Sequence, residues 1–383
     1  MKVVHICMVA YIDGWGYQDN LLPDYMTQAG HDVVVVTSKN HFPSFLKETE
    51  IRKIQEKGYD YYYGNVHVYR ILTNITTANY TFFCSGLNDI LKKEKPDAIF
   101  HHGVNSSSML LCWYYVLLHP STNFFIDNHS DKINESPQKL WNFFVIGGLM
   151  RLCTKLVQSK VTKFYGVTPG RCDYFKEVYG ACPSKIDLMP IGCDTNSIDI
   201  IDSDKEELIE KYNIPIDAFI LVSGGKMGID KGTISLIESY KSLKELKSNV
   251  ILVLFGRFTD RETEELAKCT SGVYIYGWCD RIQTLELLKL SDIACWPIHH
   301  TTLIEDAVGA AIPLVVRHTS NTSHIIEQNG EYVESGGKDE IFNAIQKIIV
   351  NYDAYKKDTV RMRNKYSYKA LVSQFEIDCK SIR

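Results

Sequence analysis

The chain has 383 residues, of which 45% are hydrophobic and 23% are charged. This length allows roughly two domains with sizeable cores, and a formal net charge of -4 does not favour a nucleic-acid binder, which normally needs a strongly basic face. The 11 cysteines are scattered singly and form no C-x-x-C pair, so we expect a reducing cytoplasm rather than a disulfide framework.

Strand-like apolar runs alternate with helical or loop segments through the first half of the chain. The runs cover residues 3–9, 31–37, 66–71, 98–101, 123–126 and 164–167. The first run is interpreted as a buried strand rather than a signal peptide, because His5 interrupts it and no small-residue cleavage site follows. This alternation predicts a parallel, doubly wound sheet.

A second series of strands follows a polar interval at residues 194–217. Its runs cover residues 219–223, 250–255, 273–276, 293–296 and 314–316. The chain is therefore expected to form two similar Rossmann-like domains. Within the interval, Asp202 and Asp204 form a D-x-D pattern, but the sequence K-E-E-L-I-E-K-Y that follows indicates a capped helix start. No other cluster has ligand spacing, so no catalytic metal is expected.

Glycine-bearing turns follow several strands. Gly14 and Gly16 lie between the first strand and a helix expected around residues 20–28, where backbone can approach a ligand and a helix N-terminus attracts phosphate. The third glycine of a dinucleotide fingerprint is missing, which disfavours a nicotinamide cofactor.

The turn at residues 223–232 reads S-G-G-K-M-G-I-D-K-G and carries Lys226 and Lys231. Both lysines could reach one diphosphate, or both could be solvated loop charges. Arg257 follows the next strand, and these junctions are expected to converge at the carboxyl ends of the strands.

The stretch W-P-I-H-H-T-T-L-I-E-D-A-V-G-A-A-I-P, residues 296–313, is rich in polar groups for a junction between a strand and a helix. A helix is predicted to begin at Thr301, after His299 and His300, with Glu305 and Asp306 in its first turns. A structural junction needs only a cap, so the stretch is either an elaborate cap or a ligand site.

The order of these motifs resembles the family 4 glycosyltransferases, retaining enzymes of the GT-B fold. The resemblance rests on G-W-G-Y-Q at residues 14–18, A-G-H-D-V at 29–33, K-I-D-L-M-P-I-G-C-D at 185–194 and the turn at 225–232. It implies two facing Rossmann-like domains with a cleft between them. Residues 1–193 and a returning helix at about 361–383 would form the acceptor-side domain, and residues 194–360 the donor domain.

The resemblance also implies roles for single residues. His129, Lys226 and Lys231 would be the catalytic residues, and His102 would line the acceptor pocket. The implied donor-binding residues are Gly14, Gly16, Gly225, Arg257, His299, His300, Thr301, Thr302, Glu305 and Asp306. Either Glu305 or Asp306 would contact the ribose, and the first glutamate of the family's E-x7-E pattern is absent.

The implied reaction transfers a sugar from a nucleotide sugar, such as a UDP- or GDP-sugar, to a glycan or lipid-linked acceptor, with retention and without a metal or cofactor. The lysines would stabilise the departing diphosphate, and His129 would position the sugar. Bacterial envelope or capsule assembly in the cytoplasm fits this reaction. Two alternatives stay open: a GT-B nucleotide-sugar epimerase and a non-catalytic binding subunit.

The segment at residues 138–160 carries basic residues and no acidic ones. Trp141, Phe143 and Phe144 lie near its start, and Arg151 and Lys155 interrupt its apolar run. Residues 139–160 are therefore expected either to lie on an anionic membrane surface or to form a cationic helix packed on the first domain.

Overall fold

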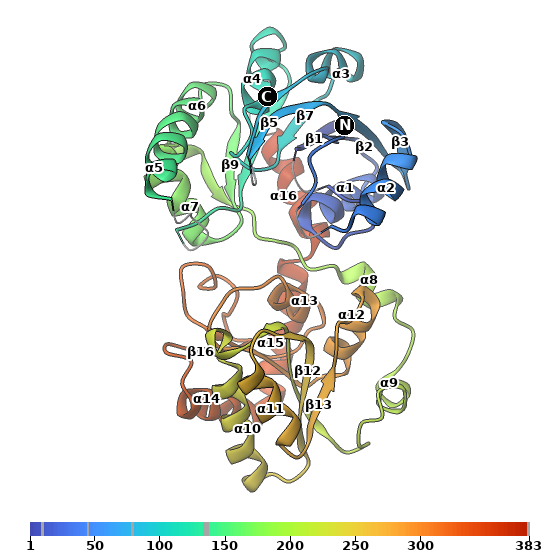
Figure 1. Cartoon of the computed structure of the whole chain (residues 1–383), viewed down its shortest axis with the longest axis vertical. Coiled ribbons are helices and arrows are strands. Elements are labelled where there is room, and N and C mark those ends of the chain that lie inside the picture. Colours follow the sequence, from blue (N-terminus) through green and yellow to red (C-terminus); the bar gives the residue numbers. More distant parts are fainter. Residues whose placement is uncertain (9–10, 44–45, 78–79, 133–137, 381–383) are drawn as a thin grey trace. The chain divides into compact units, whose positions relative to one another are not determined.

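The computed structural model describes residues 1–8, 11–43, 46–77, 80–132 and 138–380. The chain divides into two compact units (Figure 1). Unit 1 comprises Met1–Pro190 and Leu371–Arg383, and unit 2 comprises Ile191–Ala370. The boundary after Pro190 thus lies three residues before the predicted domain boundary, which follows residue 193.

The sheet of unit 1 has the strand order β10-β9-β8-β7-β1-β2-β4-β3. The strands are β1 (Lys2–Cys7), β2 (Asp32–Ser38), β3 (Asp60–Tyr63), β4 (Val66–Ile71), β7 (Ala98–His101), β8 (Asn123–Asn128), β9 (Lys163–Gly166) and β10 (Ile186–Leu188). All neighbours are parallel except β3 and β4, so the predicted doubly wound sheet is confirmed. The antiparallel edge strand β3 and the hairpin β5 (Thr73–Thr77)–β6 (Tyr80–Cys84) were not predicted.

Helices cover both faces of this sheet because alternate strand residues are apolar on each face. The helical segments of unit 1 are α1 (Gln18–Gln28), α2 (Glu48–Glu56), α3 (Leu87–Glu94), α4 (Ser108–Leu118), α5 (Lys139–Trp141), the π-helical η1 (Asn142–Met150), α6 (Arg151–Val157), α7 (Pro169–Tyr174), η2 (Phe175–Tyr179) and η3 (Pro183–Lys185), with α16 (Tyr368–Lys380) returning from the end of the chain. Val4 and Ile6 share a core with α3, α4 and α6. On the other face, Phe375 of α16 packs against Phe100 and Phe125.

The sheet of unit 2 is wholly parallel, with the order β13-β12-β11-β14-β15-β16. Its strands are β11 (Phe219–Met227), β12 (Val250–Phe258), β13 (Val273–Tyr276), β14 (Ile293–Trp296), β15 (Leu314–Arg317) and β16 (Gly330–Val333). Its helical segments are α8 (Thr195–Ile200), α9 (Lys205–Lys211), η4 (Ile229–Lys231), α10 (Thr233–Leu246), α11 (Arg261–Cys269), α12 (Arg281–Leu290), α13 (Leu303–Gly309), α14 (Lys338–Val350) and α15 (Tyr352–Lys365).

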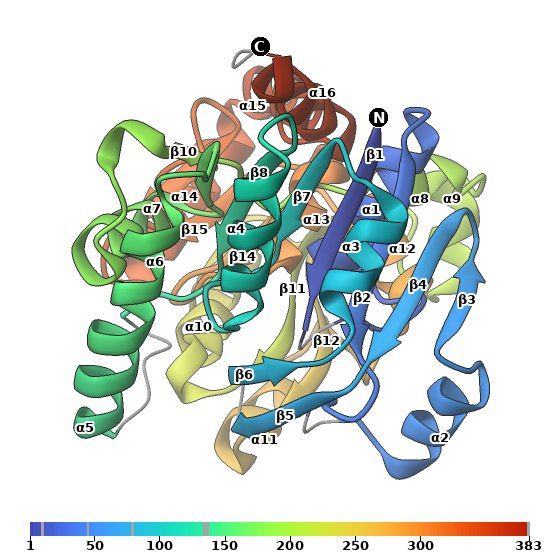
Figure 2. The same cartoon turned by 90° about the horizontal axis from the view of Figure 1, so that it is seen from above.

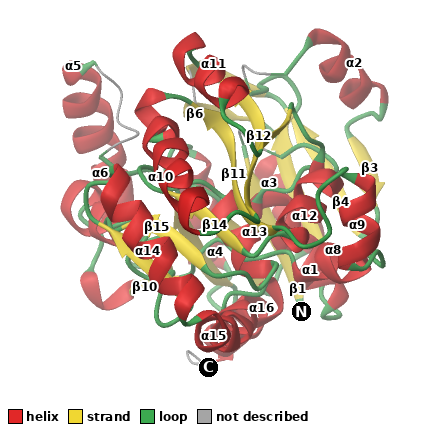
Figure 3. Ribbon diagram, turned by 90° about the horizontal axis from the view of Figure 1, so that it is seen from below, coloured by secondary structure: helices red, strands yellow, loops and turns green. Residues whose placement is uncertain are grey.

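Helices flank this second sheet (Figure 3), and two separate hydrophobic cores lie on its two faces. Leu221 joins a core with α10, α11 and α14, whereas its neighbours Ile220 and Val222 join a core with α9, α12, α13 and α15. In the polar interval, the Asp204 side chain accepts a hydrogen bond from Glu207 N at the start of α9 and completes a capping box with it. The interpretation of Asp204 as a helix cap is confirmed.

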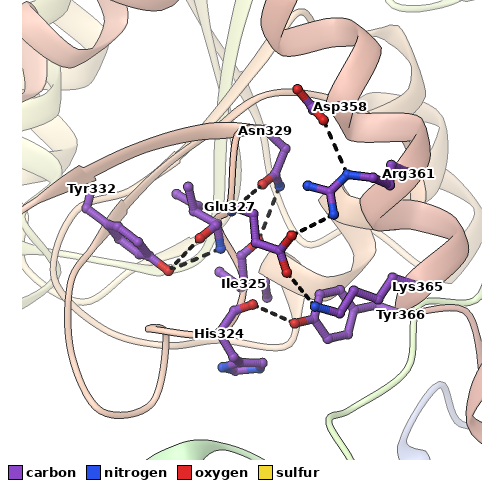
Figure 4. A network of polar contacts seen from close by, with 10 residues as sticks. His324, Ile325, Glu327, Asn329, Tyr332, Asp358, Arg361, Lys365 and Tyr366 are labelled. Atoms are coloured by element: carbon purple, nitrogen blue, oxygen red, sulfur yellow. Dashed lines mark hydrogen bonds and ion pairs between the residues drawn. The ribbon is translucent and has the colours of Figure 1, made fainter.

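A polar network fixes the loop between β15 and β16 onto α15 (Figure 4). Glu327 forms ion pairs with Arg361 and Lys365 of α15, and Tyr366 Oη donates to His324 O at 2.5 Å. Tyr332 Oη donates to Thr322 O at 2.7 Å, which ties the same loop to β16. These contacts hold the backbone of the loop in place at Thr322 and His324.

The C-terminal segment forms two helices rather than one returning helix. α15 packs on α13 and α14, so it belongs to unit 2, and the predicted return at about residue 361 falls inside it. After α15, the chain runs beside the segment that leads from unit 1 into α8. Cys193 N donates to Tyr366 O at 2.8 Å, and Cys193 forms an isolated parallel β-bridge with Ser367. The part of the chain that joins unit 1 begins at Leu371.

Candidate active site

The strand order of unit 2 reverses between β11 and β14, and in parallel sheets ligands bind beside the carboxyl ends of the strands at such a point. Trp296, at the end of β14, donates its indole N–H to Gly224 O of β11 at 3.0 Å and so joins the carboxyl ends of these two strands. The glycine-rich turn after β11 and the His299–His300 loop after β14 therefore start from neighbouring strands.

Two glycines let the turn approach that loop and α13. Gly225 has a φ of 96°, and a Cβ there would lie 3.3 Å from Leu303 Cδ1 at the start of α13. Gly232 has a φ of 72°, and a Cβ there would lie 2.6 Å from Ile298 Cγ1. A side chain at Gly232 would be strained and would push against the loop, so glycine suits this contact.

The predicted diphosphate cations lie on three elements of unit 2. Lys226 is exposed at the end of β11, directly beside Arg257 in the register with β12. Lys231 ends the short turn η4 and forms an ion pair with Asp230 at 3.1 Å. Burial and the positive charge of Lys231 both lower the pKa of His299, which favours the neutral imidazole at neutral pH.

His300 and Glu305 form a buried pair. His300 Nε2 lies 2.7 Å from Glu305 Oε1, and Glu305 is 2% exposed. Burial alone would raise the pKa of Glu305, but His300 and then His324 lower it below the ordinary value. Its other oxygen, Oε2, is buried and has no hydrogen-bond partner among the residues that the structure describes. A buried carboxylate oxygen without a donor is costly, so Oε2 is suited to accept a hydrogen bond from a ligand.

Asp306 is differently placed. Its Oδ2 pairs with Arg281 Nη1 at 2.5 Å, and Arg281 Nη2 also lies 3.4 Å from Asp194 Oδ2. Burial raises the pKa of Asp306, and Arg281 opposes the rise. Arg281 thus joins α13 to α12 and to Asp194, the N-cap of α8. Asp306 therefore already has an ion-pair partner, whereas Glu305 Oε2 has no hydrogen-bond partner among the described residues.

The predicted helix start was wrong by two residues. α13 begins at Leu303, Thr302 occupies the N-cap position, and its side chain makes no capping hydrogen bond. Thr301 lies in the loop, where its carbonyl oxygen accepts from Ile304 N at 3.0 Å. The backbone N–H groups at the helix start therefore belong to residues after the two threonines.

In unit 1 the corresponding reversal lies between β1 and β7, and a buried cluster occupies the carboxyl ends there. His102 Nδ1 lies 2.8 Å from Asp127 Oδ2 and 3.2 Å from Asp19 Oδ1, and its Nε2 lies 3.0 Å from His5 Nδ1. Gly103 N donates to the second oxygen of Asp127 at 2.6 Å.

The cluster holds a charged histidine next to a neutral one. Burial would lower the pKa of His102, but Cys7 and the Asp127 and Asp19 carboxylates raise it well above its ordinary value. Burial and the nearby His102 charge lower the pKa of His5. Burial would raise the pKa of Asp127, but His102 and His129 hold it far below its usual range. His102 is therefore an imidazolium that donates to Asp127 and to His5.

His129, the predicted catalytic histidine, joins this cluster through the same carboxylate. Its Nε2 donates to Asp127 Oδ2 at 3.2 Å, and its side chain is 37% exposed. The prediction that His102 lines an acceptor pocket needs correction, because its side chain is 3% exposed and is committed to Asp127, Asp19 and His5. Asp127 and Asp19 were missed, since no sequence pattern links residues on β8 and α1 to a histidine after β7.

The glycine turn after β1 also lies at this end of the sheet. Gly14 has a φ of 81°, and Gly16 lies one residue before Tyr17, the N-cap of α1. Gln18, which the sequence did not single out, is 4% exposed, and both of its amide atoms lack a hydrogen-bond partner among the described residues.

Two groups of these side chains have the spacing of cation ligands: Cys7, Asp19 and His102, and His102, Asp127 and His129, with ligand atoms within 4.8 Å of one another. Within these groups, contacts already described join His102 to Asp19, and Asp127 to His102 and His129. The expectation that no catalytic metal is used stays a prediction.

Residues 204–370 match the family described as Glycosyl transferases group 1. No curated protein matches the chain in sequence. Among solved structures, the Anabaena protein HepE in complex with UDP is similar over 100% of both chains, with a TM-score of 0.68 and 14% identity. A glycosyltransferase from Rickettsia africae is similar over 100% of this chain and 98% of its own, with a TM-score of 0.66 and 16% identity.

Sucrose-phosphate synthase from Thermosynechococcus elongatus is similar over 98% of this chain and 97% of its own, with a TM-score of 0.63 and 14% identity. These likenesses, together with the two parallel sheets, show the predicted GT-B class of fold with two Rossmann-like units. The family match within unit 2 supports a glycosyltransferase, which is the coarser form of the predicted function.

Proposed function

We propose that this protein is a retaining glycosyltransferase that uses a nucleotide sugar and no metal. The proposal rests on the buried Glu305, whose Oε2 has no hydrogen-bond donor among the described residues. Glu305 lies on α13, near whose start the glycine-rich turn of unit 2 packs. A ribose hydroxyl of the nucleotide would satisfy that oxygen. Asp306, already paired with Arg281, would not take this role.

In this proposal unit 2 binds the nucleotide diphosphate through backbone at Gly225 and through the cations Lys226, Lys231 and Arg257. Preorganised cations stabilise the negative charge that develops on the leaving diphosphate. A neutral His299 would donate or accept a hydrogen bond at the phosphate or the sugar.

Retention is proposed to follow from attack on the face that the diphosphate leaves. The bond from the anomeric carbon to the diphosphate oxygen breaks, the acceptor oxygen bonds to that carbon on the same face, and the acceptor proton passes to the departing phosphate oxygen. His129, held by Asp127, would orient the sugar rather than act as an obligatory base.

A uridine nucleotide is the first donor to test, because HepE was solved with UDP and with UDP-glucose. The proposed acceptor is a glycan or a lipid-linked glycan, as in bacterial envelope or capsule assembly. The proposed location is the cytoplasm, on the inner face of the cell membrane where the acceptor is lipid-linked.

Calorimetric titration with UDP tests this assignment on Glu305→Gln and Asp306→Asn. Glu305→Gln should weaken UDP binding at least tenfold, because a hydrogen bond to a charged partner contributes about 1.5–3 kcal/mol. Asp306→Asn should instead lower the melting temperature, because it removes a partner from buried Arg281. Equal UDP affinity in Glu305→Gln and the unaltered protein would remove Glu305 from the site.

The open alternatives are separated by incubation with a labelled UDP-sugar. Transfer or slow hydrolysis would support a glycosyltransferase, an epimerised donor without acceptor would show an epimerase, and no response to UDP, GDP or ADP conjugates would favour a non-catalytic subunit.

A further inference from the structure

The segment 139–157, which runs from α5 through η1 to α6, exposes one long apolar face. Among the described residues it is the one helical segment long and apolar enough to cross a membrane by length and composition. Six of its side chains, which we term the apolar stripe, are between 43% and 73% exposed: Leu140, Phe143, Phe144, Leu149, Leu152 and Leu156. η1 is π-helical and so has more residues per turn than an α-helix; with this turn the six positions fall along one side of the segment, opposite the buried Ile146 and Met150.

The opposite side of the segment is fixed to unit 1. Ile146, Met150 and Val157 belong to its core. Arg151 Nη1 donates to Glu177 O and to Val178 O, each at 2.7 Å. This arginine therefore satisfies carbonyl groups at the end of η2, and we do not count it among the cations that could contact lipid headgroups. The segment cannot cross a bilayer without losing these contacts, and only its exposed side is available to a partner.

Trp141 is placed differently from the two phenylalanines that follow it. Trp141 packs edge-on against Tyr80 and Phe82 of the hairpin, at centroid distances of 5.5 and 6.4 Å. It therefore anchors the start of the segment to unit 1, while Phe143 and Phe144 remain outside.

Helix α4 packs on α6 (Figure 2). It adds further exposed apolar side chains. Its exposed residues Tyr114, Leu117 and Leu118 are spaced by three and four and share one side of the helix. Soluble monomers seldom expose apolar patches of this length, and those that do usually bind something.

The charged residues of the segment have one sign, whereas Glu177 of η2, which packs on η1 and α6, is acidic and pairs with Lys132 at 2.8 Å. Residues 138–160 include no acidic residue, α4 has no charged residue, and Lys139 and Lys155 are exposed beside the apolar stripe. The whole chain has a net charge of -4, so the positive charge is local. A second copy of the chain meeting this face in a symmetric dimer would bring lysines against lysines. An anionic lipid surface offers both the apolar depth and the opposite charge.

We infer that unit 1 docks on an anionic membrane surface through the apolar stripe, with Lys139 and Lys155 at the level of the lipid headgroups. The segment lies along the interface for about 28 Å, given the rise of a helix. This inference names the surface that would serve the proposed membrane location, and it does not depend on the proposed donor or reaction.

Sedimentation of the full-length protein with vesicles tests the inference. The probes are vesicles of 70% phosphatidylcholine and 30% phosphatidylglycerol, and vesicles of phosphatidylcholine alone. The unaltered protein should bind the anionic vesicles more tightly, and salt should weaken the difference. Phe143→Glu with Leu152→Glu should reduce binding at least tenfold, and Lys155→Glu about fivefold.

Matched controls lie on unit 2. Ile200 and Ile216 are 79% and 72% exposed, so Ile200→Glu with Ile216→Glu should leave vesicle binding unchanged. Arg261→Glu, at a side chain that is 90% exposed, controls for charge reversal. No vesicle binding by the unaltered protein, equal losses in stripe and control variants, or a dimer that the stripe variants abolish would each overturn the inference.

UDP binding is measured on the same variants and should not change, because the apolar stripe belongs to unit 1 and the residues proposed to bind the nucleotide diphosphate belong to unit 2. A protein that binds vesicles but no nucleotide would retain this inference and remove the proposed function. The reverse result would remove the inference alone.

Discussion

Asp127 is the residue that joins the two histidines of unit 1. One of its oxygens accepts from His102 and from His129, and the other accepts from Gly103 N. A carboxylate held in this way cannot rotate, so it fixes the ring plane of His129 and the proton on Nε2, leaving Nδ1 as the ring atom for a substrate. Asp127 is thus a positioning residue for His129.

Asp127→Asn should lower the stability of unit 1 by about 3–5 kcal/mol at pH 7, because it leaves buried His102 without its main counter-charge. The loss should depend on pH with a defined sign. The folded-state pKa of His102 is raised, so its stabilisation is complete below about pH 6.5 and declines as pH rises through the folded-state pKa.

In the variant, the folded-state pKa of His102 should no longer exceed that of the unfolded chain. The difference in unfolding free energy between the two proteins should therefore narrow as pH rises from 7 to 8. Urea unfolding at several pH values measures this difference, and groups common to both proteins cancel. Asp19→Asn, at 3.2 Å from His102, should act in the same direction with smaller size. A difference that stays constant with pH would show that His102 is not the titrating group.

The residue types of the candidate site could be predicted from the sequence, but their partners could not. Lysines in a glycine-rich turn and acids at the start of a helix are visible in the chain order. The choice between Glu305 and Asp306 depends on Arg281, which lies on α12 and reaches Asp306 only in the folded unit. His102 was misjudged for the same reason, since its two carboxylate partners lie on α1 and β8.

At the scale of elements, the paired ends of β11 and β12 position the cations of unit 2. Gly256 has a φ of 112°, and a Cβ there would lie 2.1 Å from Gly225 O. This close approach of two backbones permits Lys226 and Arg257 to stand side by side.

Gly256→Ala should therefore force β11 and β12 apart at their carboxyl ends. We expect a loss of stability of at least 2 kcal/mol, from strain at the positive φ and from the backbone clash, with weaker nucleotide binding. Gly277→Ala is the matched control, because a Cβ there meets nothing within 4 Å although its carbonyl accepts from Gly256 N. Melting temperature and UDP titration report both effects, and similar values for the two variants would contradict the argument.

The predictable elements were the buried strands, whose continuous apolar runs are typical of parallel sheets covered on both faces. β3 was missed because Asp60–Tyr63 is a short, half-exposed edge strand whose sequence D-Y-Y-Y does not alternate. The π-helical η1 could not be foreseen, since residues 142–150 are apolar on nearly every position and fit any helical period.

At the scale of the whole molecule, the end of the chain completes the first unit. Phe375 of α16 is fully buried, with its ring 4.8 Å from that of Phe125, and Asp378 accepts from Tyr165 Oη at 2.7 Å and pairs with Lys163 at 2.9 Å. Unit 1 therefore lacks part of its core until residues 371–380 have been synthesised, whereas the core of unit 2 is built within Ile191–Ala370.

Phe375→Ala should consequently destabilise unit 1 alone. Removing a buried phenylalanine ring costs about 3–5 kcal/mol, which corresponds to at least a hundredfold loss of hydrogen-exchange protection in β7 and β8. Protection in β11 and β12 should stay unchanged, because these strands draw no core residue from α16. Ile377→Ala on the same helix is the control, since Ile377 is 59% exposed and its loss should cost less than about 0.5 kcal/mol. If β11 and β12 lost protection together with β7 and β8, the two units would unfold as one cooperative structure, and the assignment of α16 to unit 1 would not describe their energetics.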